Sequence, residues 1–264
     1  MKRQLLKIRT KNHTASPLKG AIIAKVRTVF RLGSSTPTNE IFPKGVTEGK
    51  RILEINTAQS CHNSGNKILM KSLFSENNVK SAEWAVLNQG GLANDWVYYP
   101  AIIKHKNSCK GNGIYYIEDV AQLMDFMANK HAENYIIEKY YNYSKEYRLH
   151  VTKDGCFYTC RKMLKEDAQE RWHRHDTNSV WIMDTNPLFE RPSNWDDLVS
   201  ACVEALNAVG LTIGACDIKI QTEKGKNRGQ SPEFIIMEVN SAPSFGEETL
   251  IRYIQKLQEI INEN

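Results

Sequence analysis

Short blocks of apolar residues, separated by polar turns, run along the whole chain and predict its strands and helices. Continuous short apolar runs are typical of buried strands, whereas apolar residues three and four positions apart are typical of amphipathic helices. Val120, Leu123 and Met127 follow the helical spacing. Strands are predicted over 21–30, 51–56, 98–105, 113–117, 135–141, 212–220 and 233–240, and helices over 65–74, 119–130, 196–209 and 250–261.

A hairpin is predicted where the turn pair Asp154-Gly155 separates the apolar runs 146–151 and 156–163. The stretch 164–192 follows neither spacing. Because strands and helices alternate through the rest of the chain, we expect an α/β (α+β) architecture of packed layers.

The composition narrows the class of protein. The chain has 264 residues, of which 41% are hydrophobic and 25% charged, as in ordinary globular proteins. No apolar run reaches the roughly 18 residues of a transmembrane helix, and the first residues lack the apolar segment of a signal peptide. We therefore expect a cytoplasmic protein with no membrane partner and six free cysteines. The net charge of +5 suits an anionic ligand but is too diffuse to indicate nucleic acid.

Two apolar strands near the C-terminus carry acidic and amide side chains. Side chains alternate between the faces of a strand, so Glu238 and Asn240 share a face of one strand, and Asp217 and Lys219 share a face of the other. If the strands are neighbours, Asp217, Glu238 and Asn240 converge. Their oxygen atoms are ligands that Mg²⁺ prefers. The alternative is a solvated face with ordinary charges.

Two earlier segments suggest nucleotide binding. Lys104 ends an apolar strand and is followed by the loop 106–113, where lysines and glycines suit a phosphate. Further on, Glu138 and Glu146 bracket a turn whose backbone groups suit an adenine and whose glutamates suit ribose hydroxyls. Taken separately, the first segment is more typical of a hairpin with a polar tip and the second of a strand end with exposed charges.

In this order the segments resemble the ATP-grasp superfamily, over about residues 96–250. The resemblance is strongest to the glutathione-synthetase and ribosomal-protein-glutamate-ligase branch and to short phage-type carboxylate–amine ligases. It implies two α+β subdomains that grip ATP, preceded by a reduced α/β substrate region at 1–95. The implied ATP-grasp domain, 96–264, divides into a lid subdomain at about 96–141 and a metal-binding subdomain at about 142–264. The segments that carry the resemblance are YPAIIKH, a Gly-rich loop, IIEKYY, EYRLHV, CRKM, ACDIKI and EVNSAPSF.

The resemblance also implies a role for individual residues. Lys104 and Lys110 hold ATP phosphates, Lys110 from a lid over residues 105–113 that closes on the nucleotide. Arg161, together with Lys104, serves catalysis by stabilising the transferred phosphoryl group. Glu138, Lys139 and Tyr141 form the adenine hinge, Glu146 binds the ribose, Asp217, Glu238 and Asn240 bind two Mg²⁺ (or Mn²⁺), and Ser241 to Phe245 border the acceptor site.

Substrate binding is expected at Arg31, Ser34 and Asn56 of the reduced region, and at Arg148 and Ser241. The implied activity is an ATP-dependent carboxylate–amine ligase. It makes an acyl phosphate, transfers the acyl group to an amine of an amino acid, peptide or protein, and releases ADP and phosphate. The alternatives are an ATP-grasp kinase that phosphorylates a small-molecule hydroxyl and a non-catalytic module that binds a nucleotide or nucleic acid.

Overall fold

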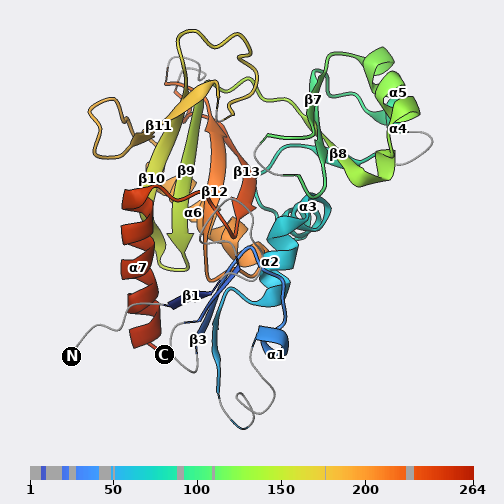
Figure 1. Cartoon of the computed structure of the whole chain (residues 1–264). Helices are drawn as coiled ribbons and strands as arrows, with labels where there is room; N and C mark the ends of the chain where they lie inside the picture. Colours follow the sequence, from blue (N-terminus) through green and yellow to red (C-terminus); the bar gives the residue numbers. More distant parts are fainter. Residues whose placement is uncertain are drawn as a thin grey trace.

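The computed structural model describes residues 7–9, 20–23, 28–41, 49, 51–87, 92–108, 111–175, 177–223 and 229–264. Within these residues the chain forms three β-sheets with helices packed on them. Figure 1 shows the largest sheet upright beside α7, the sheet with β7 and β8 set to one side of it, and the N-terminal sheet below.

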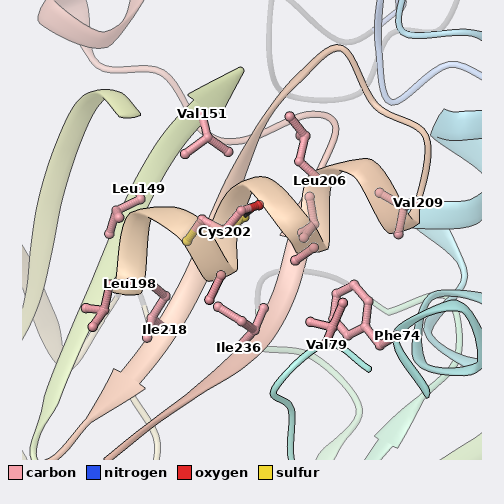
Figure 2. Close-up of a cluster of buried hydrophobic side chains, with 14 of the residues drawn as sticks. Phe74, Val79, Leu149, Val151, Leu198, Cys202, Leu206, Val209, Ile218 and Ile236 are labelled. Carbon is pink, nitrogen blue, oxygen red and sulfur yellow. Dashed lines mark hydrogen bonds between the residues drawn. The ribbon is translucent and has the colours of Figure 1, made fainter. Parts of the chain in front are cut away.

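The largest sheet, here called the central sheet, has the strand order β11-β10-β9-β12-β13 and is antiparallel throughout. Its strands carry buried apolar residues on one face, and α6 covers that face. Figure 2 shows Leu198, Cys202 and Leu206 of this helix packed between Leu149 and Ile236 of the sheet. The elements are β9 (Lys145–Thr152), β10 (Gly155–Leu164), β11 (Ser179–Met183), β12 (Ile213–Ile220), β13 (Phe234–Asn240) and α6 (Trp195–Ala208).

The second sheet, here called the small sheet, has the order β5-β8-β6-β7. Its outer face packs on α4 and α5 through Ile103, Ile137 and Phe126, which are all buried. The elements are β5 (Trp84–Val86), α4 (Leu92–Asp95), β6 (Ala101–His105), β7 (Ile114–Ile117), α5 (Val120–Asn129), η1 (Ala132–Asn134) and β8 (Tyr135–Lys139).

The N-terminal sheet runs β1-β2-β3-β4 and packs against the long C-terminal helix α7, where Phe30 and Tyr253 share a core. Helix α3 joins the central and small sheets, because Phe74 is buried in the core of the central sheet while Lys71 reaches the small sheet. The elements are β1 (Lys7–Arg9), β2 (Gly20–Ile23), β3 (Thr28–Leu32), α1 (Thr38–Ile41), β4 (Leu53–Ile55), α2 (Ala58–Gly65), α3 (Lys67–Glu76) and α7 (Glu247–Asn262).

The mixed architecture predicted from the sequence is confirmed, and the Asp154-Gly155 turn joins β9 to β10 as predicted. The unassigned stretch 164–192 contains β11, an edge strand. A domain boundary at residue 95 divides the small sheet, since β5 pairs with β8. The register of β12 and β13 shifts after Asp217, and Ile236 beyond the shift lies in the core of the central sheet.

Candidate active site

The inner face of the small sheet carries two charged residues from neighbouring strands. Lys104 of β6 and Glu138 of β8 lie on the same face as Ile102, because Ile102 pairs with Glu138 and side chains two positions apart share a face. The residues between them, such as Ile103 and Ile137, point to the apolar core on the other side. Strand alternation therefore places both charged groups on the face away from α5.

Glu138 lies between two lysines. One carboxylate oxygen, Oε1, is 2.6 Å from Lys71 Nζ, and Lys104 Nζ donates a hydrogen bond to the other, Oε2. Burial disfavours the charge of Glu138, but Lys104 and Lys71 outweigh it and lower the carboxyl pKa to about 2. Burial also disfavours the charge of Lys104, yet Glu138, with Glu238 and Glu146 further off, raises its pKa. These last two carboxylates belong to the central sheet, so the inner face of the small sheet lies close to it.

The facing side of the central sheet brings together the predicted metal ligands. Asp217 of β12 pairs directly with Glu238 of β13, and Asn240 lies two positions further on the same face. The Asn240 side-chain amide donates to Asp217 Oδ2 at 3.2 Å and to Glu238 Oε1 at 3.1 Å. The three side chains therefore meet at one point, as the strand pattern predicts.

These residues fit a magnesium ion in the chemistry of their donors. Two facing carboxylates repel each other, and here the N–H groups of the Asn240 amide point at both of them. A half-turn of that amide directs its oxygen to the same point, which then holds three oxygen donors, the set that Mg²⁺ prefers. The described residues contain no group of three His, Cys, Asp or Glu side chains placed to hold a metal, so Asn240 is needed to complete the set.

Arg148 of β9 stands beside this group. Its Nε donates to Asp217 Oδ1 at 2.6 Å and its Nη2 to Oδ2 at 2.8 Å, a bidentate pair. Its guanidinium also lies 4.6 Å from the ring centroid of Trp181. Arg148 is therefore fixed next to the carboxylates on the face that meets the small sheet.

A second charged group surrounds Glu146 at the start of β9. Arg174 Nη1 lies 3.5 Å from Glu146 Oε2, and Lys219 is the register partner of Glu146 on β12. Lys219 Nζ donates to the carbonyl oxygen of Tyr141 at 3.4 Å, and burial lowers the pKa of this lysine to about 8. Burial raises the pKa of Glu146. The predicted ribose residue thus lies next to the predicted hinge.

The hinge side chains turn away from that group. Lys139 Nζ lies 3.5 Å from Glu83 Oε1, and the Tyr141 hydroxyl donates to Glu83 Oε2 at 2.7 Å. The Lys139 N–H donates to the Glu83 carbonyl and the Tyr140 N–H to that of Pro100. The side chains of Lys139 and Tyr141 are therefore held by Glu83 and not directed towards Glu146.

The expected position of Arg161 is wrong. Arg161 pairs with Tyr147, whose side chain is buried in the core under α6, so both residues lie on the face away from Asp217. A register shift between Cys156 and Tyr158 causes this. Without the shift Arg161 would pair with Glu146, on the inner face. Of the two arginines, it is Arg148 that lies beside the carboxylates.

Two predicted substrate residues prove to be structural. Arg31 has no exposed side-chain surface; it forms an ion pair with Glu54 Oε2 at 2.6 Å and donates to the Asn56 carbonyl at 3.1 Å. The Asn56 side chain, also buried, donates to two carbonyls and accepts the N–H groups of Thr212 and Ile213. The expectation that Arg31 and Asn56 bind substrate is therefore wrong, because their hydrogen-bonding groups are used within the fold.

The remaining predicted residues have separate surroundings. The Ser34 hydroxyl donates to Thr36 within its own turn, and the Ser241 hydroxyl bonds with that of Ser64 at 2.9 Å. Lys110 lies outside the described residues.

Two lysines near the site were not predicted, Lys67 and Lys71 of α3. Lys67 helps to lower the pKa of Glu238 to about 2, against the effect of burial. Both lie four positions apart on one helix face, a spacing that usually marks a solvated stripe. The sequence feature that could have indicated burial is Phe74, a buried residue on the same face of the helix, three positions after Lys71.

Comparisons with known proteins identify the fold. No protein-family model and no curated protein matches the sequence. Among solved structures, D-alanine–D-alanine ligase from Bacillus anthracis matches with a TM-score of 0.56 at 14% identity, over 77% of this chain and 65% of that chain. Carboxyaminoimidazole ribonucleotide synthase from Aspergillus clavatus, complexed with ATP, matches with a TM-score of 0.55 at 14% identity, over 72% and 48%. The ATP-grasp ligase PsnB, complexed with a minimal precursor, gives 0.53 at 16% identity, over 74% and 58%.

The chain thus has the ATP-grasp fold, and the resemblance to this superfamily noted in the sequence is confirmed for the fold. It spans between about half and two thirds of the length of these three structures. No helix among the described residues is long and apolar enough to cross a membrane.

Proposed function

We propose that this protein is an ATP-dependent carboxylate–amine ligase that works through an acyl phosphate. The observation that carries the proposal is the meeting of two charged groups from different sheets. Lys104, held by Glu138 on the small sheet, faces the Asp217, Glu238 and Asn240 group of the central sheet. A lysine opposite a divalent-metal site suits a bound nucleoside triphosphate, whose phosphates need both.

The charges around the two groups favour an anion. Among the described residues, seven cationic side chains and four carboxylates influence one another there, so the cationic groups outnumber the carboxylates by three. Most of these groups are buried, so solvent screens them little. The cations are Lys67, Lys71, Lys104, Arg148, Lys162, Arg174 and Lys219, and the carboxylates are Glu138, Glu146, Asp217 and Glu238.

In the proposed reaction the side chains mainly position groups and neutralise charge. Asp217, Glu238 and Asn240 would hold Mg²⁺, which neutralises phosphate charge when bound. Lys104 binds the phosphates, and Arg148 stabilises the phosphoryl group as it passes from ATP to the substrate carboxylate. This transfer releases ADP and forms an acyl phosphate. The amine then attacks the carbonyl carbon of the acyl phosphate, and phosphate departs with the bonding electrons.

The nucleotide base is proposed to bind at the linker after β8. Backbone groups of Lys139 and Tyr141 would contact the adenine, and Glu146 the ribose hydroxyls. Lys110 would add a phosphate contact from the loop 106–113. Asp217, Glu238 and Asn240 would hold two Mg²⁺, with Mn²⁺ as a substitute, because the donor set is entirely oxygen.

The substrates are proposed from the same fold. D-alanine–D-alanine ligase is named for joining two amino acids, and PsnB was solved with a minimal precursor; an amino acid, peptide or protein acceptor is proposed for this chain. Ser241 to Phe245 would border the acceptor. We also propose a cytoplasmic location, since the five described cysteines are free thiols.

The test is a screen of amino acids and short peptides, alone and in pairs, for Mg·ATP-dependent release of ADP and phosphate. A pair that stimulates both products above either compound alone supports the ligase. A kinase that phosphorylates a small-molecule hydroxyl is the second candidate, since the same site would also hold ATP for that reaction.

A further inference from the structure

Lys71 is a lysine with no access to solvent. Only 1% of its side chain is exposed, and its ammonium nitrogen lies 2.6 Å from Glu138 Oε1. The other lysine of the group, Lys104, has 16% of its side chain exposed. A ligand between the sheets therefore reaches Lys104, while Lys71 contacts Glu138 from behind, out of α3.

The Glu138 carboxylate needs at least one cation in every state of the protein. Its side chain is only 5% exposed, and a buried carboxylate that loses its last partner is strongly destabilised. When Lys104 turns to a phosphate group, its bond to Glu138 weakens. Lys71 is then the partner that remains.

We propose that Lys71 is a positioning residue for nucleotide binding: it holds the Glu138 carboxylate so that Lys104 can be shared with the phosphates of ATP. The inference rests on the proposed ATP site. Without Lys71, Lys104 is the one cation among the described residues that still forms an ion pair with Glu138, and each phosphate contact competes with a buried carboxylate. This competition for Lys104 makes nucleotide binding weaker.

A purely structural role for Lys71 makes a different prediction. Its methylene chain packs in the protein interior, with the ammonium nitrogen 5.7 Å from the ring centroid of Phe74. Loss of packing alone lowers the free energy of unfolding, but it does not make nucleotide affinity depend on the charge of Glu138. The charge of Glu138 is therefore the variable to test.

The experiment measures the dissociation constant of Mg·ADP by calorimetry for the wild type, Lys71→Met, Glu138→Gln and the double variant. Methionine keeps most of the length of the lysine side chain without its charge. We expect Lys71→Met to weaken binding at least tenfold at neutral pH in the wild-type background. In the Glu138→Gln background the same substitution should change affinity less than about twofold.

A pH series adds a second measurement, whose result loss of packing alone would not change. Without Lys71, Glu138 is protonated more readily as the pH is lowered. The ratio of the Mg·ADP dissociation constant of Lys71→Met to that of the wild type should therefore decrease as the pH falls. In the Glu138→Gln background that ratio should stay constant. Comparing ratios cancels the titration of the other groups near Glu138, which are Lys104, Lys219, Glu146 and Glu238.

Lys80→Met is the matched control, since Lys80 is an exposed lysine just after the same helix, 4.4 Å from the ring centroid of Phe234. It should leave affinity unchanged. Equal binding by Lys71→Met and wild type overturns the inference, as does a tenfold loss that persists with Glu138→Gln. If Lys71→Met does not fold, Lys71→Gln replaces it in the same comparison of the two backgrounds. A wild type that binds no Mg·ADP or Mg·ATP contradicts the proposed function itself, and this is measured first.

Discussion

Asp217 and Glu238 lie directly opposite each other on neighbouring antiparallel strands, and one amide group, that of Asn240, donates to both. Like charges in directly opposed positions destabilise a sheet. Arg148 offsets part of the repulsion through its bidentate pair with Asp217. The arrangement is costly for a fold that binds nothing there and suited to one that binds a divalent cation.

Glu238→Gln should therefore abolish Mg·ATP turnover while the protein stays folded. The substitution removes one charge with little change of shape. Because Lys67 and Lys104 hold the pKa of Glu238 at about 2 against the effect of burial, its ionised form stabilises the fold at neutral pH, and the free energy of unfolding without metal should fall without unfolding the protein. Mg²⁺ should raise the melting temperature of the wild type and not that of the variant, because a ligand stabilises only the state that binds it. ADP release and thermal unfolding with and without Mg²⁺ measure both effects.

Glu263→Gln provides the control, since Glu263 is exposed near the C-terminus, away from the site. Near-normal Mg·ATP turnover in Glu238→Gln would show that the metal assignment is wrong.

The two arginines of the β9–β10 hairpin should behave differently. Arg148→Ala should lower the rate of ADP release at least about 10²-fold, the order of magnitude found when one group that stabilises the charge of a transition state is removed. Arg148→Lys should keep only part of the wild-type rate. Arg161→Lys should leave the rate within about twofold, because Arg161 lies on the opposite face beside Tyr147. Steady-state rates of ADP release for the three variants test this. A large loss in Arg161→Lys with a small one in Arg148→Ala would reverse the assignment.

Strand alternation predicted that Asp217, Glu238 and Asn240 converge if the two strands are neighbours, because side chains of a strand keep a period of two. The resemblance implied that Arg161 lies at the phosphate site, but Arg161 is on the other face. One extra residue in β10, at the shift between Cys156 and Tyr158, reverses the facing of every residue beyond it. Nothing in the composition of that strand marks the position of the bulge.

Tertiary contacts explain the other differences. Lys71 looks like a surface residue of an amphipathic helix until the small sheet brings Glu138 within 2.6 Å of it. Asn56 looks like a free polar group at a strand end, but it has φ 59° and bonds to the start of β12, more than 150 residues away. Contacts at such separations cannot be inferred from local pattern.

The loop 105–113 is predicted to close on ATP, and Gly111 offers a test. Gly111 has φ +78°, and a Cβ atom there would lie 2.9 Å from His173 Cε1. In the wild type, Mg·ATP should suppress limited proteolysis near Lys106 or Lys110. In Gly111→Ala the loop is pushed from His173, so cleavage without nucleotide should rise and protection by Mg·ATP should weaken.

Gly229→Ala is the matched control: Gly229 has φ +81°, a similar backbone strain, but no atom within 4 Å of an added Cβ. It should leave cleavage near Lys106 unchanged. Equal cleavage of the wild type with and without Mg·ATP would count against a closing loop.

His150 should make the protein sensitive to mild acid. This side chain is buried, its Nδ1 lies 3.0 Å from the Tyr253 hydroxyl, and burial, with Arg148, lowers its pKa from 6.5 to about 3. Between these values the unfolded chain binds a proton that the folded chain does not. The stability from neutral His150 is therefore complete above pH 6.5 and decreases as the pH falls towards 3, by up to about 1.4 kcal/mol per pH unit.

Urea unfolding of the wild type and His150→Phe between pH 7.5 and pH 5 measures this contribution as a difference in slope. The variant cannot take up that proton, so its stability should fall less steeply. His131→Gln, at a histidine whose side chain is 88% exposed, should keep the wild-type slope. Parallel curves for the wild type and His150→Phe would contradict the prediction.

The last prediction separates a ligase from a kinase. A ligase of the proposed kind makes an acyl phosphate, an electrophile that a strong nucleophile intercepts. With Mg·ATP and the correct acid, hydroxylamine should therefore give a hydroxamate, with ADP and free phosphate in equal amounts. Omitting the acid, or replacing Glu238 by Gln, should remove all three products. A kinase would instead leave the phosphoryl group on a stable product, with ADP formed and no free phosphate. Such a product, or AMP in place of ADP, would exclude the carboxylate–amine ligase.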